Sequence, residues 1–397
     1  MHVDLDAFFV EVCRQRRPEL RDIERLVVGG RRESRGVVQS ASYGARKFGV
    51  RAGMPIAQAV VLCPDATFFK GEFSWYTAAS RQVHDILAEL APTVAMASLD
   101  EGYLDFSGTE RLYPVSLLDT AGKVRDRIRE RSGLDSSIGI GPNRMIAKLA
   151  SDAAKPRGIM EVRAGWEEGF LAWLPLRALP GVGPKTSRRL AEVGLSDVWQ
   201  VQCMSLNQLE RLLGDEAQAL KLRAHGHGGT VLRPERLPRS VSRETTFSDD
   251  LRDPDEMEAV LLLFSGRVAA QLRDEGLLAR TVTLKIRHDD FVTVTRRVTL
   301  PEATDLDGEI FTAARDLFRV AFQDVRRRDR GVRLVGVAAT GLSQASAPDL
   351  FESDSRRRQR ALTRAMDAVR GKYGVNALEP GRVVELRKRK SDELRRD

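Results

Sequence analysis

The chain has 397 residues, too many for one hydrophobic core and enough for two to four domains of about 100–200 residues each. Hydrophobic residues make up 42% and charged residues 30%, as in globular proteins, and no apolar run approaches the ~18 residues needed to cross a bilayer. The N-terminus has acids where a signal peptide needs a basic flank, so we expect a cytoplasmic protein without a membrane segment. The net charge of +8 suits a polyanionic partner, although many proteins merely have a basic surface.

The cysteines and two histidines carry no recognisable site. Cys13, Cys63 and Cys203 show neither the spacing of a disulfide framework nor that of the usual zinc motifs, so we expect reduced thiols. His225 and His227 could bind a metal, but without further ligands they are interpreted as residues of a Gly-rich linker.

The first 165 residues mix short β-like runs with helical stretches, which predicts an α+β domain. The β-like runs are Leu26–Gly29, Val94–Phe106 and Ser136–Gly141. Residues 166–229 are predicted to be almost entirely helical, with regularly placed leucines that supply a small core. Residues 230–241 contain two prolines and three arginines without periodicity, which indicates an extended basic linker.

A second α+β domain is predicted over residues 242–342, with the element order β-α-β-β-α-β. Its expected elements are Ser242–Ser248, a helix from Pro254 to about Glu275, Arg280–His288, Val292–Leu300, Leu306–Arg326 and Arg333–Leu342. Within the second strand apolar residues alternate with Lys285 and Arg287, so one sheet face is apolar and the other cationic. We interpret the cationic face as a surface that follows phosphates, the alternative being a merely solvated face. The tail is predicted to form a basic helix, Ser355–Tyr373, and then a frayed charged end over the last ten residues.

Two acidic motifs could carry chemistry. Asp4 and Asp6 follow a short β-run, and Asp6 is placed as the N-cap of the helix that comes next, which leaves the following amides free for an anion. Asp100 and Glu101 lie between two strand runs beside Gly102, and both can serve one site only if the backbone bends there. Three carboxylates from adjacent strands would form an oxygen-rich cage for Mg²⁺, and two such ions can hold the attacking and leaving oxygens of a phosphoryl transfer.

Cationic groups suited to a triphosphate are also present. Tyr43 and Arg46 occur in one polar segment and Lys155 in another, and a charge-assisted clamp of Arg and Lys is what phosphoryl transfer needs. Each of them alone could equally be an ordinary surface residue.

Five sequence strings occur together in one order and at one approximate spacing: HVDLDAFF, SASYGARKFGVRAGMP, SLDEGYLDFSG, SIGIGPNRMIAKLASDAAKPRGI and LPGVGPKTSRRLAEVGL. In this the chain resembles the Y-family DNA polymerases, and most of all their DNA polymerase IV branch. The resemblance implies a right-hand fold of class α+β. It places a palm at 1–165 with fingers inserted at about 11–70, a helix-hairpin-helix thumb at 166–229, a basic linker at 230–241, a split βαβ little finger at 242–342, and a tail at 343–397.

The resemblance also implies a role for particular residues. It makes Asp4, Asp100 and Glu101 the catalytic ligands of two Mg²⁺ ions, with the Leu5 carbonyl as a further ligand. It assigns dNTP binding to Phe8 through its amide, Phe9, Ser40, Tyr43, Arg46 and Lys155. Phe9 falls at the family's steric gate, the ring that excludes a ribose 2′-hydroxyl, although it could instead be a core residue. The thumb turn implies DNA contacts at Gly181, Gly183 and Lys185, which we add to Lys285 and Arg287 of the cationic face.

Several positions depart from the family pattern. Gly44 and Gly102 stand where an acid and an Ala are usual, but neither change removes a ligand. Gln39 is bulkier than the small residue expected near the nascent base pair, which leaves the lesion preference open. Cys13 stands where Glu is common, and the N-terminus is a few residues short before the first strand.

The implied reaction is template-directed addition of dNTPs to a primer 3′-hydroxyl by a monomer, with low fidelity and lesion bypass in DNA repair. We expect no proofreading nuclease, since the chain has no room for one. A non-catalytic DNA-binding scaffold of the same family is the alternative, and loss of the three acids would indicate it. A nucleotide cyclase with a similar palm would not account for the thumb turn and the little finger.

The segment 344–351 implies a further partner. Polymerases of this branch commonly carry there a Gln-x-x-Leu-Phe type peptide that docks into the sliding clamp, and residues 347–351 end in Leu350 and Phe351. Ala347 replaces the expected Gln, so weakened docking is expected. The alternative is that Leu350 and Phe351 cover the adjacent basic helix.

Overall fold

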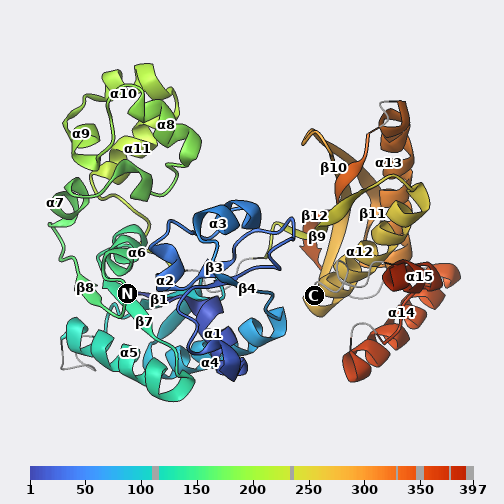
Figure 1. The fold of residues 1–397 in the computed structure, drawn as a ribbon, viewed down its shortest axis with the longest axis horizontal. Helices are drawn as coiled ribbons and strands as arrows, with labels where there is room; N and C mark the ends of the chain where they lie inside the picture. Colours follow the sequence, from blue (N-terminus) through green and yellow to red (C-terminus); the bar gives the residue numbers. More distant parts are fainter. Residues whose placement is uncertain (110–115, 233–236, 328–329, 346–352, 375–376, 390–397) are drawn as a thin grey trace. The chain divides into compact units, whose positions relative to one another are not determined.

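The computed structural model describes residues 1–109, 116–232, 237–327, 330–345, 353–374 and 377–389 (Figure 1). The chain divides into two compact units, the first Met1–Arg32 with Val37–Glu235 and the second Glu33–Gly36 with Arg236–Asp397. Among the helices that the model describes, none is long and apolar enough to cross a membrane. All three cysteines are free thiols, as expected.

A five-stranded sheet in the order β5-β6-β1-β7-β8 forms the centre of the first unit. Its strands are β1 (His2–Leu5), β5 (Thr93–Met96), β6 (Glu101–Asp105), β7 (Ser136–Ile140) and β8 (Ile159–Glu161). All neighbours pair antiparallel except β7 and β8. The expected run Val94–Phe106 forms two strands joined by a bend at residues 97–100, where the Ala97 amide donates to the Glu101 carbonyl at 2.9 Å.

Helices cover both faces of this sheet. They are α1 (Phe8–Arg16), α4 (Phe73–Leu90), α5 (Leu117–Ser132) and α6 (Arg144–Ala153). Val3 and Leu5 of β1 join the buried core of α1, α4 and α5, whereas the alternating residues His2 and Asp4 face α6. Helix α6 lies close on β7, since a Cβ at Gly139 would come within 1.9 Å of a backbone carbonyl of α6.

A smaller sheet, β3-β2-β4, is inserted between α1 and α4 and has its own core. It consists of β2 (Leu26–Val28), β3 (Ser40–Ala41) and β4 (Thr67–Phe69), accompanied by the 3₁₀ turn η1 (Pro18–Leu20) and by α2 (Tyr43–Arg46) and α3 (Ile56–Leu62). The sheet and its helices occupy the stretch in which an insertion was expected.

The rest of the first unit is helical, as the sequence predicted. It contains α7 (Glu167–Ala172), the 3₁₀ turn η2 (Leu176–Ala178), α8 (Pro184–Ala191), α9 (Val198–Cys203), α10 (Leu206–Leu213) and α11 (Glu216–Ala224). Leucines such as Leu171, Leu190 and Leu209 are almost completely buried in its core. Gly181 adopts φ +88° in the tight turn before α8, a conformation that favours glycine.

The second unit has the predicted β-α-β-β-α-β order. Its antiparallel sheet, β11-β10-β12-β9, is built from β9 (Ser240–Leu251), β10 (Leu277–His288), β11 (Thr293–Thr304) and β12 (Val332–Gln344). Helices α12 (Pro254–Asp274) and α13 (Asp307–Arg327) pack on the apolar face of the sheet. Val282, Leu284 and Ile286 are at most 1% exposed, so the predicted alternation of β10 is confirmed.

Two tail helices complete this unit, α14 (Asp354–Tyr373) and α15 (Gly381–Arg389). Helix α14 has Thr363 as its buried residue and is held mainly by ion pairs, including Arg360–Asp305 at 3.1 Å and Arg273–Asp367 at 2.6 Å. Helix α15 instead inserts Val383 and Leu386 into the apolar core. The expectation of a frayed end is therefore wrong for residues 388–389, which continue a helix that apolar contacts anchor.

Candidate active site

The three acids of the candidate site lie at one end of β1 and β6. Asp4 and Glu101 are direct partners in the antiparallel ladder of these strands, and the Leu5 amide donates to the Asp100 carbonyl at 2.8 Å. Asp100 occupies the bend before β6, where the Ser98 hydroxyl donates to its carboxylate. The bend thus brings both acids of the pair next to β1. In the described ranges no three acidic, His or Cys side chains are already gathered as a metal site.

Two lysines form ion pairs with carboxylates of the site. The Lys155 ammonium lies 2.8 Å from Asp4 Oδ2 and 2.9 Å from Asp152 Oδ1, and the Lys148 ammonium donates to Glu101 Oε2. Lys148 and Asp152 come from α6, and Lys155 follows two residues after this helix ends. Because α6 covers the sheet face that carries Asp4, the helix and the residues directly after it place both cations beside the acids.

Burial and hydrogen bonding give the acids different pKa values. The neighbouring His2, aided by the hydrogen bond from Lys148, lowers the pKa of Glu101 to about 2 although burial opposes this. Burial raises the pKa of Asp4 and outweighs the neighbouring Lys155. The pKa of Lys155 is raised in spite of its burial, because Asp4 and Asp152 favour the charged ammonium. The site therefore holds two ammonium groups against its carboxylates.

His2 and Lys148 were missed by sequence reasoning. His2 is fully buried, with Nδ1 2.7 Å from Ser151 Oγ, Nε2 3.6 Å from Glu101 Oε2, and its ring 4.6 Å from that of Tyr103. One signal was available for each residue. His2 is two positions before Asp4 on a strand, and Lys148 is four before Asp152 on a helix, so each shares a face with a polar site residue.

The expectation that Asp6 caps α1 is wrong. The N-cap is Ala7, at φ 46° and ψ 37°, without a side-chain capping bond. The Asp6 amide donates to the Asp135 carbonyl at 2.9 Å, so residue 6 lies in the turn that leaves β1, and the helix begins at Phe8. The Asp6 carboxylate, 4% exposed, accepts instead from the Tyr43 hydroxyl at 3.1 Å, the Ser137 hydroxyl at 3.0 Å and the Arg157 amide at 2.8 Å.

Helix α2 carries the two expected phosphate ligands from the small sheet. The Arg46 guanidinium lies 5.0 Å from the centre of the Tyr43 ring, and its Nε donates to the Ala41 carbonyl at 2.9 Å. Burial and the nearby Asp6 raise the pKa of Tyr43 to about 12, so its hydroxyl stays protonated at neutral pH. Ser40 is buried in β3 opposite Val28.

Phe8 and Phe9 begin helix α1 beside these groups. Phe8 is 1% exposed in the core, whereas Phe9 is only partly buried and packs edge-on against Tyr76 at 4.7 Å. The first backbone hydrogen bonds of the helix come from the Val10 and Glu11 amides, which donate to the Ala7 carbonyl at 2.8 and 3.1 Å, so the Phe8 and Phe9 amides before them can donate to an anion. Phe9 therefore packs against the core through Tyr76 and keeps part of its ring exposed at the start of α1.

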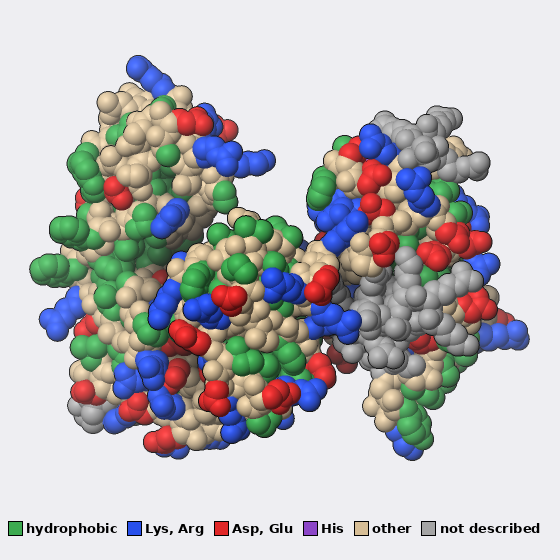
Figure 2. Space-filling model, in the orientation of Figure 1, with side chains coloured by type: hydrophobic (Ala, Val, Ile, Leu, Met, Phe, Trp, Pro, Cys, Tyr) green, Lys and Arg blue, Asp and Glu red, His purple; other side chains and the backbone are tan. Residues whose placement is uncertain are grey.

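The expected DNA contacts lie on two separate surfaces. Gly181 and Gly183 form the turn before α8, which Gly183 caps, and Lys185 is exposed in the first turn of this helix. On the open face of β10, Lys285 pairs with Glu244 at 2.9 Å and Arg287 donates to the Thr293 hydroxyl at 2.9 Å. Acidic and basic side chains intermingle over the face of the molecule seen in Figure 2, so net charge alone would not have located either surface. Leu350 and Phe351 lie outside the described residues.

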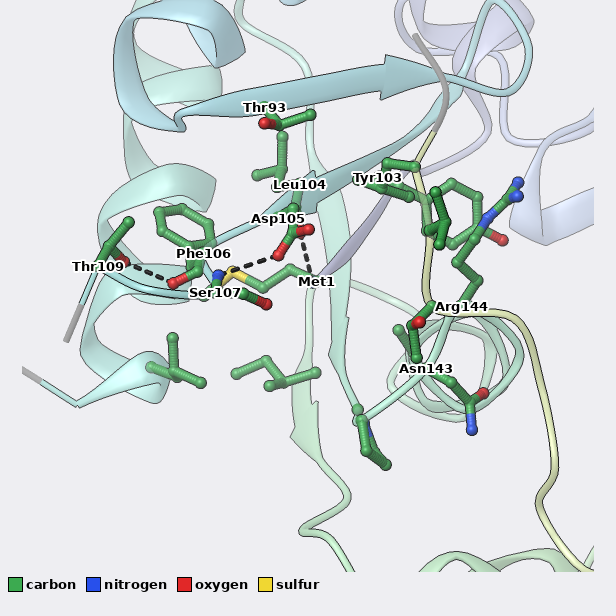
Figure 3. Close-up of a pocket in the computed structure, with 18 of the residues that line it drawn as sticks. Met1, Thr93, Tyr103, Leu104, Asp105, Phe106, Ser107, Thr109, Asn143 and Arg144 are labelled. Carbon is green, nitrogen blue, oxygen red and sulfur yellow. Dashed lines mark hydrogen bonds between the residues drawn. The ribbon is translucent and has the colours of Figure 1, made fainter.

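A cavity of about 800 Å³ lies at the opposite end of β6 (Figure 3). It is lined by Asp105, Ser107 and Arg144 among others, and by none of the three acids of the candidate site. Its polar groups bond locally, as with the Ser107 amide and Asp105 Oδ1 at 2.9 Å. Glu101 is four residues away along the strand, about 13 Å at the usual rise, so this cavity is separate from the candidate site.

Comparison with known proteins agrees with this architecture. Residues 3–152 match the model of the impB/mucB/samB family, residues 238–350 match its C-terminal domain, and residues 177–220 match the thumb domain of DNA polymerase-iota. DNA polymerase IV of Caulobacter vibrioides is 38% identical over 97% of this chain and 94% of its own length. DNA polymerase IV of Dehalococcoides mccartyi is 39% identical over 98% of each chain.

Solved structures show the same likeness. A Y-family DNA polymerase chimera of Dbh and Dpo4 superimposes with a TM-score of 0.73 at 26% identity, covering 86% of this chain and 98% of the other. DinB from Sulfolobus solfataricus gives a TM-score of 0.58 at 27% identity, covering 85% and 97%.

The right-hand fold of palm, fingers, helical thumb and little finger, with paired acids on the palm sheet, defines the class of Y-family DNA polymerases. Within this class, the chain belongs to the DNA polymerase IV family. It is a translesion, DNA-directed DNA polymerase, whose nucleotidyl transfer depends on a divalent metal. The resemblance inferred from the five strings is confirmed, and nothing favours the non-catalytic alternative.

Proposed function

We propose that Asp4, Asp100 and Glu101 form the catalytic centre of this polymerase and hold two Mg²⁺ ions together with the Leu5 carbonyl. The direct pairing of Asp4 with Glu101, each carboxylate already bearing a cation, carries this proposal. Oxygen-only donors suit a hard ion such as Mg²⁺, so the residues fit the metal. When bound, the ions lower the charge on the reacting phosphate and favour attack by the primer 3′-hydroxyl.

The remaining site residues bind and align the dNTP. Lys155, Arg46 and Tyr43 contact the triphosphate, with Ser40 and the amide of Phe8 completing the cradle. The Arg46 guanidinium lies over the Tyr43 ring, and the Lys155 ammonium pairs with Asp4. We assign no general base among the residues that the structure describes, so alignment and electrostatic stabilisation supply the catalysis.

Phe9 selects the sugar and two surfaces bind the primer-template DNA. The partly buried ring of Phe9 crowds a ribose 2′-hydroxyl at the start of α1. Gly181, Gly183 and Lys185 bind a DNA phosphate at a helix start, and Lys285 and Arg287 contact phosphates from the little-finger sheet. An insertion ternary complex of Dbh DNA polymerase, 27% identical to this chain with a TM-score of 0.58, supports DNA and nucleotide as partners.

The domain division and further partners are part of the same proposal. The palm spans 1–165 with fingers at about 11–70, the thumb 166–229, the linker 230–241 and the little finger 242–342. The protein acts as a cytoplasmic monomer, and residues 347–351 of the 343–397 tail bind the sliding clamp.

Primer extension with purified variants tests the catalytic centre. Asp100→Ala and Glu101→Ala should each abolish nucleotide addition with Mg²⁺ and dNTPs while leaving the Kd for primer-template DNA unchanged, because the acids hold metal and the basic surfaces hold DNA. Asp105→Ala, which removes an acid from the far end of β6, is the matched control and should extend normally. Near-normal extension by either catalytic variant would overturn the assignment.

A further inference from the structure

We infer that Asp6 is a positioning residue that aligns both arms of the triphosphate clamp from a single buried carboxylate. The inference rests on the proposed roles of Tyr43, Arg46 and Lys155. The described hydrogen-bond partners of the Asp6 carboxylate are Tyr43, Ser137 and Arg157, none of which is an expected ligand of the metal, and the carboxylate makes no capping bond to α1.

The first arm runs through Tyr43. The Tyr43 hydroxyl donates to Asp6 Oδ1 at 3.1 Å, which fixes the ring, and the ring in turn supports the Arg46 guanidinium at 5.0 Å. These two residues belong to α2, which accompanies the small sheet, whereas Asp6 directly follows β1 of the five-stranded sheet. Asp6 is thus the point at which the palm holds the phosphate ligands of the fingers.

The second arm runs through the segment after α6. The Arg157 amide donates to Asp6 Oδ2 at 2.8 Å, two residues beyond Lys155, so the carboxylate fixes the backbone that carries this lysine. Ser137 of β7 holds the carboxylate itself through bonds of 3.0 and 3.1 Å to its two oxygens. With three donor groups and 4% exposure, the carboxylate has little freedom to move.

The backbone around Asp6 agrees with a constrained functional position. Three non-glycine residues have positive φ within the described part of the chain, and two of them adjoin Asp6: Ala7, at 46°, follows it in the chain, and Arg157, at 56°, donates its amide to the carboxylate. Left-handed backbone is unfavourable for residues with a Cβ, and such conformations persist where surrounding interactions determine them. The amide bond from Arg157 to Asp6 is one such interaction.

Steady-state kinetics of Asp6→Asn tests the inference. The amide keeps the shape of the carboxylate but cannot accept from all three donors, so one arm is released. The KM for dNTP and the inhibition constant of inorganic tripolyphosphate should rise together by about tenfold, with a smaller change in kcat, as for the loss of one or two charge-assisted hydrogen bonds. The Kd for primer-template DNA and the Tm should stay the same.

Three further variants keep the outcomes distinct. Asp135→Asn makes the same change on an acid that pairs with the side chains of Arg129 at 2.7 Å and Arg157 at 3.8 Å but leaves the Arg157 amide bond to Asp6 in place, and it should leave KM unchanged. The combined variant Asp6→Asn with Tyr43→Phe should raise the KM for dNTP by less than the two single effects together predict, because both substitutions remove the same hydrogen bond. An unchanged KM in Asp6→Asn, or additive effects in the double variant, overturns the inference. If both Asp6→Asn and Arg46→Ala leave the KM for dNTP unchanged, the proposed binding of the triphosphate by these residues is itself wrong.

Discussion

Asp4 lies directly opposite Glu101 across β1 and β6, yet the pKa values of the two carboxyls move in opposite directions. Burial dominates at Asp4, whereas the neighbouring His2 and Lys148 dominate at Glu101. The two paired strands therefore place Glu101, whose lowered pKa favours the ionised form, opposite Asp4, whose raised pKa favours the protonated form. This difference has a measurable effect on stability.

The metal-free protein should lose stability when Glu101 is changed to Gln, and the loss should depend on pH. The pKa of Glu101 lies at about 2, below its ordinary value of 4.5, so its ionisation stabilises the fold above about pH 4.5 and this contribution disappears as pH falls toward 2. Allowing for the partial exposure of the side chain, we expect about 1–2 kcal/mol at pH 7. Urea unfolding of both proteins in EDTA between pH 7 and pH 3 measures the difference. A difference that does not narrow below pH 4.5 would contradict the origin given for the pKa.

Changing Phe9 to Ala should admit ribonucleotides. The ring excludes a 2′-hydroxyl by contact, and relief of a steric clash changes discrimination far more than a lost methylene, which is worth about 1–3 kcal/mol. Single-nucleotide insertion with matched dNTP and rNTP should show discrimination falling by orders of magnitude. Tyr76→Phe, which keeps the ring that supports Phe9, is the control and should retain discrimination. If the Phe9 variant still rejects ribonucleotides, its ring is a core residue.

Replacing Lys285 and Arg287 by Ala should flatten the salt dependence of DNA binding. Each phosphate contact contributes about 0.9 to the slope of log K against log salt, so the slope should fall by about 1–2 without any change in sequence preference. The pairing of Lys285 with Glu244 places the expected change toward the lower end. Arg319→Ala with Arg382→Ala removes the same charge from residues that both pair with Glu258, and should keep the slope. Equal slopes in the Lys285 and Arg287 variant and the wild type would show that this sheet face does not contact DNA.

Replacing Leu350 and Phe351 by Ala should abolish the stimulation of processivity by the sliding clamp and leave distributive synthesis intact. The reason is that a few large apolar side chains carry most of the binding energy of such peptides. Extension on a long primed template, with and without loaded clamp, measures both quantities. Leu362→Ala with Tyr373→Ala removes two side chains of α14 that are 63% and 67% exposed, and should change neither. Loss of basal activity in the first variant would indicate a packing role instead.

The helices and strands could be predicted where a local sequence pattern reflects burial or capping. Val282, Leu284 and Ile286 alternate with polar residues because one sheet face is covered, and this alternation is visible in the sequence. Asp253, whose carboxylate caps α12, and Pro254 at the start of that helix are similarly local signals. Helix α15 gave no such signal, since Val383 and Leu386 stand among charged residues and are buried only by contact with a distant core.

The candidate site likewise has one part that the local sequence predicts and another part that it does not. The acids Asp100 and Glu101 are adjacent in sequence, so the bend that they require could be stated in advance. Asp6 was assigned to its own helix because a cap is a local interaction, whereas its actual donors lie 37, 131 and 151 residues away in the chain. Pairings of this kind depend on how strands and helices meet, which no short segment records.

The contrasting attachments of the two tail helices imply a contrasting response to temperature. Helix α14 is held by ion pairs such as Arg360–Asp305, and the cost of removing water from charges falls as temperature rises. Helix α15 is held by Val383 and Leu386, and apolar attraction weakens on cooling. Cooling therefore loosens the last helix of the tail, while warming leaves the charged one comparatively well attached.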